Sequence, residues 1–205
     1  MIGRWEAKKG QAPDDNDIER IYSKSLTATL DVLPSNSHLI SGTVETINLL
    51  RSKYGIKIGS STGYTSEIME KLRPQAAKGG YAPDCYVTSD MVPTARPSPA
   101  MIFLNMIKMD IWTPKSVVKV DDTTGGIEAG LYGGCWTVGI AKTGNYVGLT
   151  ESEMDKMNPE ELEVKVEKAR QILLKCGAHY VIDTIKDLPG VIDKINARLA
   201  MGLSP

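Results

Sequence analysis

Short apolar runs alternate with amphipathic helical segments along most of the chain, and this alternation constrains the fold more than any other feature of the sequence. Each run has the length of a strand, and the segments between the runs carry apolar residues at every third or fourth position. This order is typical of βαβ units. We therefore predict an α/β fold: a Rossmann-like parallel sheet with helices on both faces. The expected strands lie near residues 56–60, 85–88, 116–120, 135–140 and 180–182.

Capping residues and breakers mark where the intervening helices should begin and end. Asn158-Pro159-Glu160-Glu161 combines a capping side chain, a first-turn proline and a third-position glutamate, and Gly177 follows the last apolar position of that helix. In the same way, Ser41 is expected to cap a helix that Gly55 ends. The other helices are expected from Thr65 onward with an interruption at Pro74, from Ser98-Pro99 through Met109, from about 124 to 132, and over 188–200.

The N-terminal part of the chain differs from this pattern. A helix is expected over residues 14–33, and Pro34 with the polar residues 35–38 should end it. We therefore predict a small helical unit over residues 1–34 and an α/β domain over residues 35–205. The apolar side of the first helix needs a partner, from further helices or from a second copy of the chain.

Composition excludes several classes of function. The 24 Lys and Arg residues balance 25 Asp and Glu residues, giving a formal net charge of -1, so a nucleic-acid partner is not expected. No apolar stretch approaches the roughly 18 residues of a membrane span. The first nine residues lack the apolar core of a secretory signal, and the three cysteines form no CxxC pair. We expect a cytoplasmic protein without a membrane partner.

Polar residues follow three of the predicted strands, where ligands bind in open parallel sheets. Thr62 follows the first strand, Arg96 lies in the loop after the second, and Asp121-Asp122 follow the third. A hydroxyl at a helix start and an arginine suit a phosphoryl group, and paired carboxylates suit Mg²⁺. Taken singly, these residues are most simply a turn hydroxyl, a surface arginine and helix-capping carboxylates. Together they predict a site for a phosphoryl group and a metal ion.

Three stretches, in this order, resemble the second, third and fourth motifs of the phosphonoacetaldehyde hydrolases, a branch of the haloacid dehalogenase-like superfamily. They are residues 59–65, 95–99 and 119–123, and the likeness continues through residues 144–149 and 177–182. An arginine before a proline in the third motif is fairly specific to this branch. So is a tyrosine two residues after the second-motif threonine.

The resemblance implies a haloacid dehalogenase-like core, a partial helical cap and Mg²⁺-dependent hydrolysis of phosphonoacetaldehyde to acetaldehyde and phosphate. An aspartate would attack phosphorus while a cap lysine holds the aldehyde as a Schiff base. The resemblance assigns phosphoryl binding to the Thr62 hydroxyl and the Gly63 backbone, clamping to Arg96, Mg²⁺ ligation to Asp122, and a place in the site lining to Tyr64. It also implies a small phosphonate substrate and a homodimer formed through the cap.

Two departures from the family pattern matter. The position four residues after Asp122, often a second acid in the superfamily, is Gly126, and either Asp121 or Glu128 could replace that acid at the metal. The likeness also begins inside the cap, so the central first strand with its nucleophile and the cap lysine are expected to be missing. Lys8 and Lys9 do not match the lysine motif.

A missing central strand would leave backbone groups unpaired on both neighbouring strands, at a cost of about 1–3 kcal/mol for each buried group. We therefore expect the chain to be inactive as it stands, and either unstable or rearranged so that the flanking strands pair directly. Two alternatives stay open. The chain could be a non-catalytic truncated paralogue or fragment, or it could be another phosphatase or mutase of the superfamily.

Overall fold

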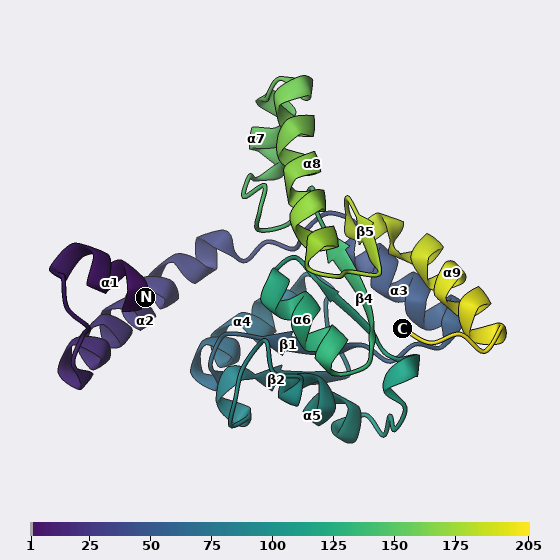
Figure 1. Cartoon of the computed structure of the whole chain (residues 1–205), viewed down its shortest axis with the longest axis horizontal. Helices are drawn as coiled ribbons and strands as arrows, with labels where there is room; N and C mark the ends of the chain where they lie inside the picture. The colour runs from purple at the N-terminus through teal and green to yellow at the C-terminus, as the bar shows by residue number, and fades with distance from the viewer. Residues whose placement is uncertain (1) are drawn as a thin grey trace.

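The computed structural model describes residues 2–205, without the side chains of residues 2–4, 6 and 34, and short parallel strands form the centre of this part of the chain (Figure 1). One sheet pairs β1 with β2, and a second has the order β3-β4-β5. All the strand pairs are parallel. The α/β class and the parallel pairing are therefore confirmed. The strands are β1 (Gly59–Thr62), β2 (Cys85–Thr88), β3 (Val118–Asp121), β4 (Trp136–Ile140) and β5 (Tyr180–Ile182).

The helices follow the expected alternation. Two of them, over 124–132 and 188–200, have the predicted bounds. Asn158 caps α8 as predicted, because its side-chain oxygen accepts the amides of Glu160 and Glu161. Across residues 2–205, none of the helices has the length and hydropathy needed to cross a bilayer. The helices are α1 (Ile2–Lys9), α2 (Asp15–Asn36), α3 (Thr43–Tyr54), α4 (Ser66–Lys78), α5 (Ala100–Lys108), α6 (Thr124–Tyr132), α7 (Glu151–Lys156), α8 (Pro159–Lys175) and α9 (Leu188–Ala200), with 3₁₀ turns at Ser89–Met91, Pro114–Ser116 and Ile185–Asp187.

Four of the predicted helix details are wrong. One is the cap of α5, because the helix follows Pro99 and Ser98 does not take the cap position. Pro74 lies inside α4 without interrupting it, and α2 continues past Pro34 to Asn36. A proline removes one helical hydrogen bond, a loss that packing of the rest of a helix can offset. Ser41 is not the cap of α3, since Gly42 takes that position with φ 80°. The Ser41 hydroxyl instead donates a hydrogen bond to Glu151.

Helices cover both faces of the three-stranded sheet, as the sequence predicted. On one face, α3 and α9 pack against Trp136, Val138 and Ile182. On the other face, Ile127 of α6 packs against the buried residues of α8. Figure 1 shows α9 lying alongside α3, with α8 extending beyond the sheet.

Glycines let α6 approach the sheet closely. A Cβ atom on Gly130 would lie 2.5 Å from Thr137 Cγ2 and 2.9 Å from Lys119 Cβ. Gly126, one helical turn earlier, faces the end of β3. The close contact of α6 with β3 and β4 therefore depends on two positions without a side chain.

Side chains connect the two sheets where strands do not. Within residues 2–205, β1 and β3 share no backbone ladder, so the direct pairing that we considered does not form. Lys119 Nζ lies 3.1 Å from Ser61 Oγ in β1 and 2.8 Å from Asp121 Oδ2. The Ser60 carbonyl accepts a hydrogen bond from Asn105 Nδ2 at 3.2 Å. Lys119 therefore connects the two sheets through side chains, and Asn105 satisfies one backbone carbonyl of β1.

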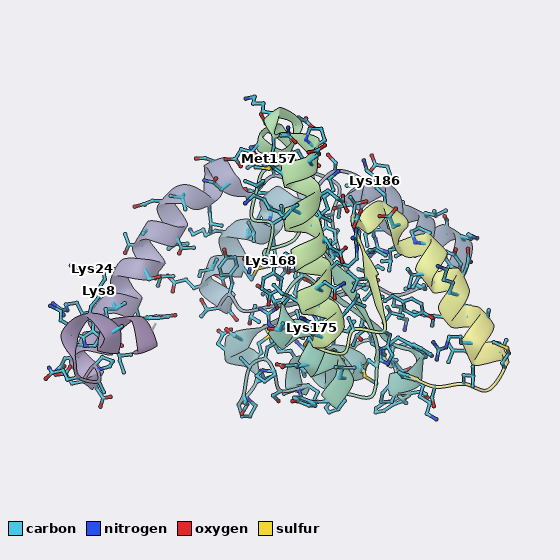
Figure 2. The ribbon with its side chains drawn as sticks, turned by 45° about the horizontal axis from the view of Figure 1, so that its top comes forward. Lys8, Lys24, Met157, Lys168, Lys175 and Lys186 are labelled. Carbon is cyan, nitrogen blue, oxygen red and sulfur yellow. The ribbon has the colours of Figure 1, made fainter. Side chains whose placement is uncertain are left out.

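The first two helices form an arm that projects from the α/β part in both views (Figures 1 and 2). The arm is joined to the rest where α2 packs against α4, and Ser37 there donates a hydrogen bond to Gln75. Figure 2 shows Lys8 and Lys24 on this arm. The division of the chain after residue 34 stays a prediction.

We predict that Lys119→Met lowers the free energy of unfolding by about 2 kcal/mol, because it leaves the carboxylate of Asp121 with less compensation in a buried setting. The side chains of Lys119 and Asp121 are only 11% and 7% exposed. Denaturant unfolding measures the loss. Lys53→Met removes the exposed pair with Asp193 and serves as the matched control, with little change expected. Equal effects of the two variants would contradict a structural role for Lys119.

The pH dependence of the free energy of unfolding should reveal the protonation of His179. Burial, with a smaller contribution from Arg198, lowers the pKa of His179. The Thr137 amide donates to His179 Nδ1 at 3.1 Å, so that nitrogen must stay unprotonated. The unfolded chain takes up a proton near pH 6.5, whereas the folded chain takes it up only at lower pH. The contribution of neutral His179 to the free energy of unfolding is therefore complete above about pH 6.5. It falls as the pH drops toward the folded-state pKa.

We expect urea melts to show this fall as the pH drops below about 6.5, and His179→Gln to remove most of it, because glutamine keeps an acceptor that does not titrate. A slope that His179→Gln leaves unchanged would assign the effect to other groups.

Candidate functional site

Arg96 lies between the turn that follows β1 and the end of β3. Its Nη1 is 3.2 Å from Asp121 Oδ2, and its Nη2 is 3.1 Å from the place that a Cβ on Gly63 would occupy. Residues from three of the loops singled out in the sequence therefore meet at one edge of the strands. The side chain of Arg96 is 28% exposed and is the most accessible of the group formed by Arg96, Lys119 and Asp121.

The turn after β1 is held by hydrogen bonds from both sides. Thr62 Oγ1 accepts the amide of Tyr64 at 3.1 Å, which leaves the threonine hydroxyl proton free to donate. Ser89 Oγ donates to the Gly63 carbonyl at 3.0 Å, and the Ser89 amide donates to the Tyr64 carbonyl at 3.1 Å. The start of α4 lies directly beyond, with Thr65 as its cap residue. The Ser66 amide at the start of α4 already donates to the carboxylate of Asp90. This turn can therefore offer the Thr62 hydroxyl and the Gly63 amide to an anion.

Tyr64, which the resemblance assigns to the site lining, has a side chain that is 41% exposed. Its backbone is fixed by Thr62 and Ser89. The ring is accessible at the surface beside the turn, and its part in binding stays a prediction.

The carboxylate of Asp121 is surrounded by donors. Lys119 and Arg96 bind Oδ2, while the amide and hydroxyl of Thr123 donate to Oδ1 at 3.0 and 2.8 Å. Burial pushes the pKa of Asp121 upward, but the charge and hydrogen bond of Lys119, the Thr123 hydrogen bond and Arg96 together outweigh it, so the pKa lies below its usual value. Asp121 is therefore an ionised group whose oxygens already have partners.

Asp122 has a different environment. Its Oδ2 accepts the amide of Asn145 at 2.9 Å, and a Cβ on Gly144 would approach Asp122 Cβ to 2.9 Å. The hydroxyl of Tyr146, also in this loop, bonds the amide and side chain of Thr124 at 3.2 Å each. The loop after β4 therefore closes against Asp122 and fixes its carboxylate.

Asp122 is the better candidate of the two aspartates for a metal ligand. The part of the chain that the structure describes holds no group of three or more His, Cys, Asp or Glu residues suited to an ion. Mg²⁺ commonly uses only one or two carboxylates and completes its shell with water and substrate phosphate. A single fixed carboxylate meets that requirement.

Gly126 has no room for a side chain, because a Cβ there would lie 1.9 Å from Asp121 Cγ. Glu128, the other candidate for a replacement acid, lies toward α8. Cys176 is the C-cap residue of α8. Burial is the largest cause of the raised pKa of its thiol, and the charge of Glu128 is the second. The geometry therefore favours Asp121 over Glu128 as the acid near position 126.

Sequence reasoning missed several contributors. Lys119 was overlooked although a lysine inside the apolar run 117–120 is a usable signal. Ser89 and the backbone of Asn145 gave no such signal, because their roles depend on loops that meet only in the folded chain.

Known proteins resemble this chain over nearly its full length. No family model matches it. A phosphonoacetaldehyde hydrolase from Klebsiella pneumoniae is 45% identical over 203 residues, covering 98% of this chain and 75% of the relative. A crystal structure of a phosphonoacetaldehyde hydrolase-like protein from Oleispira antarctica superposes with a TM-score of 0.93 at 36% identity, covering 100% of this chain and 74% of that one.

A more distant structure supports the fold alone. A haloacid dehalogenase-like protein from Agrobacterium tumefaciens matches with a TM-score of 0.57 at 19% identity, covering 94% of this chain and 75% of the other. The parallel strands, the meeting of three motif loops at their ends and the extent of the sequence identity agree. The chain belongs to the phosphonoacetaldehyde hydrolase family and has a haloacid dehalogenase-like fold.

Proposed function

We propose that this chain supplies the phosphoryl- and metal-binding part of a Mg²⁺-dependent phosphonoacetaldehyde hydrolase, which breaks a carbon–phosphorus bond and releases acetaldehyde and phosphate. The observation that carries the proposal is the position of Arg96, held between Gly63 and Asp121. An arginine fixed over a turn with free hydrogen-bond donors is suited to phosphoryl oxygens.

Each residue has a distinct role in this proposal. The hydroxyl of Thr62 and the amide of Gly63 donate hydrogen bonds to phosphoryl oxygens. Arg96 clamps the same group from the opposite side. Donors fixed before the substrate binds need no reorganisation as charge develops during the reaction. Tyr64 limits the access of water beside the turn.

Asp122 would hold the Mg²⁺ ion, with Asn145 keeping its carboxylate in place. A bound Mg²⁺ supplies charge neutralisation of the phosphoryl oxygens. Asp121 has oxygens already used by Lys119, Arg96 and Thr123. In this proposal it therefore acts beside the metal site and does not ligate the ion.

Turnover also needs a nucleophilic carboxylate and an amine for the Schiff base. The matched part makes up 75% of the Klebsiella relative. We propose that both groups belong to a family segment outside the match. Lys8 is on the projecting arm (Figure 2) and does not match the lysine motif.

We also propose that residues 1–34, which contain most of the arm formed by α1 and α2, belong to a helical cap and that the protein pairs through it. Ile18 and Tyr22 lie four residues apart on α2, and both are exposed. Further cap helices or a second copy would cover them. Sedimentation of the wild type and of Ile18→Glu tests the pairing, and a wild-type monomer at high concentration would contradict it.

For activity, we predict Mg²⁺-dependent phosphate release from phosphonoacetaldehyde when the chain is joined to a family-type N-terminal segment carrying the aspartate and lysine motifs. The chain without that segment is expected to show none. In the joined form, Arg96→Ala should lower kcat/KM by about 100-fold or more, since it removes a donor aimed at the transition state. Arg73→Ala is the matched control, because Arg73 stacks on Tyr86 and lies outside the proposed site.

Release of phosphate from sugar phosphates, with none from phosphonoacetaldehyde, would instead favour another phosphatase or mutase activity. Release by the chain alone would contradict the view that the nucleophile lies outside it.

A further inference from the structure

Positions 121 and 126 compete for one space. An ideal Cβ on Gly126 would lie 1.9 Å from Asp121 Cγ and 2.1 and 2.2 Å from its two oxygens, whereas real Cβ contacts stay above 3.0 Å. Gly126 is inside α6 and its φ is not positive, so its backbone conformation does not require glycine. A side chain at residue 126 would therefore overlap the carboxylate of Asp121.

From that space the carboxylate reaches two cations at once. Its Oδ2 binds Arg96 Nη1 at 3.2 Å and Lys119 Nζ at 2.8 Å. With Nη1 held in this way, Nη2 of Arg96 faces Gly63. Lys119 and Asp121 are nearly enclosed, while Arg96 is more exposed, so Arg96 is the member of the three that can meet a ligand.

We propose that Asp121 is a positioning residue: its carboxylate occupies the space of a side chain at position 126 and orients Arg96 over the Thr62–Gly63 turn. The orienting role rests on the proposed phosphoryl-binding function. The overlap between the side chains of positions 121 and 126 does not depend on that function. The carboxylate in this space thus comes from the end of β3 and not from the helix.

A simpler role for Asp121 makes a different prediction. Its Oδ1 accepts the amide and hydroxyl of Thr123, so Asp121 could serve only to shape the start of α6. In that case a carboxylate placed at residue 126 would not replace it, because the carboxylate of residue 126 would come from the helix itself.

The first experiment is a stability cycle on the whole chain. Gly126→Ala in the wild type should lower Tm by about 4 °C or more, because the new methyl group overlaps the carboxylate. In an Asp121→Gly background the same change should leave Tm unchanged or raise it, since alanine is the better helix former. An equal change of Tm in both backgrounds would overturn the sharing of space.

The second experiment moves the carboxylate. With Mg²⁺ present, Asp121→Gly should weaken the binding of inorganic phosphate, measured by calorimetry, by about tenfold, the effect of misplacing one charged hydrogen bond. Asp121→Gly/Gly126→Asp should restore the affinity to within about threefold of the wild type. The control Asp121→Gly/Gly126→Asn fills the space without the charge and should not restore it.

Failure of the aspartate variant to recover affinity while it still melts cooperatively, or equal recovery with asparagine, would overturn the orienting role. A wild-type chain that binds no phosphate would reject both the proposed function and the orientation of Arg96. The stability cycle would still decide whether residues 121 and 126 share one space.

Discussion

The contact of one carboxylate, that of Asp121, with the cations of Arg96 and Lys119 connects the parts of this structure that matter for function. It joins the end of β3 to the loop after β2 through Arg96. Through Lys119 it reaches β1, which belongs to the other sheet. The carboxylate also occupies the space that a side chain at position 126 would need. Helix α6 can therefore lie this close to β3 only because residue 126 is glycine. An ion pair enclosed to this degree is costly to break, since either charge would be left without compensation.

The fold was largely predictable because its strands and helices have distinct periodicities and caps. Helices α6 and α9 have the predicted bounds, and Asn158 caps α8. The errors occur where tertiary packing overrides a local signal: Pro74 stays inside α4, and Gly42 replaces Ser41 as a cap. Strand β1 begins at Gly59, later than expected, because its extent follows its pairing with β2.

For the site, the sequence could predict which loops converge but not how their side chains pair. Parallel strands bring their carboxyl ends to one edge, so Arg96 and the two aspartates were expected together. The different environments of Asp121 and Asp122 depend on Lys119 and on the amide of Asn145, and both contacts form only in three dimensions. From these contacts we infer that Arg96, held by Asp121, completes a phosphoryl site above the turn at Thr62.

A crystal structure of the chain with Mg²⁺ and orthovanadate tests this claim most directly, because vanadate imitates a phosphoryl group and its position can be seen. We expect vanadate oxygens within hydrogen-bond distance of Thr62 Oγ1, the Gly63 amide and Arg96 Nη2, with the metal ion on Asp122 and Arg96 still bound to Asp121. Vanadate bound elsewhere, or an Arg96 side chain turned away from the turn after β1, would contradict it.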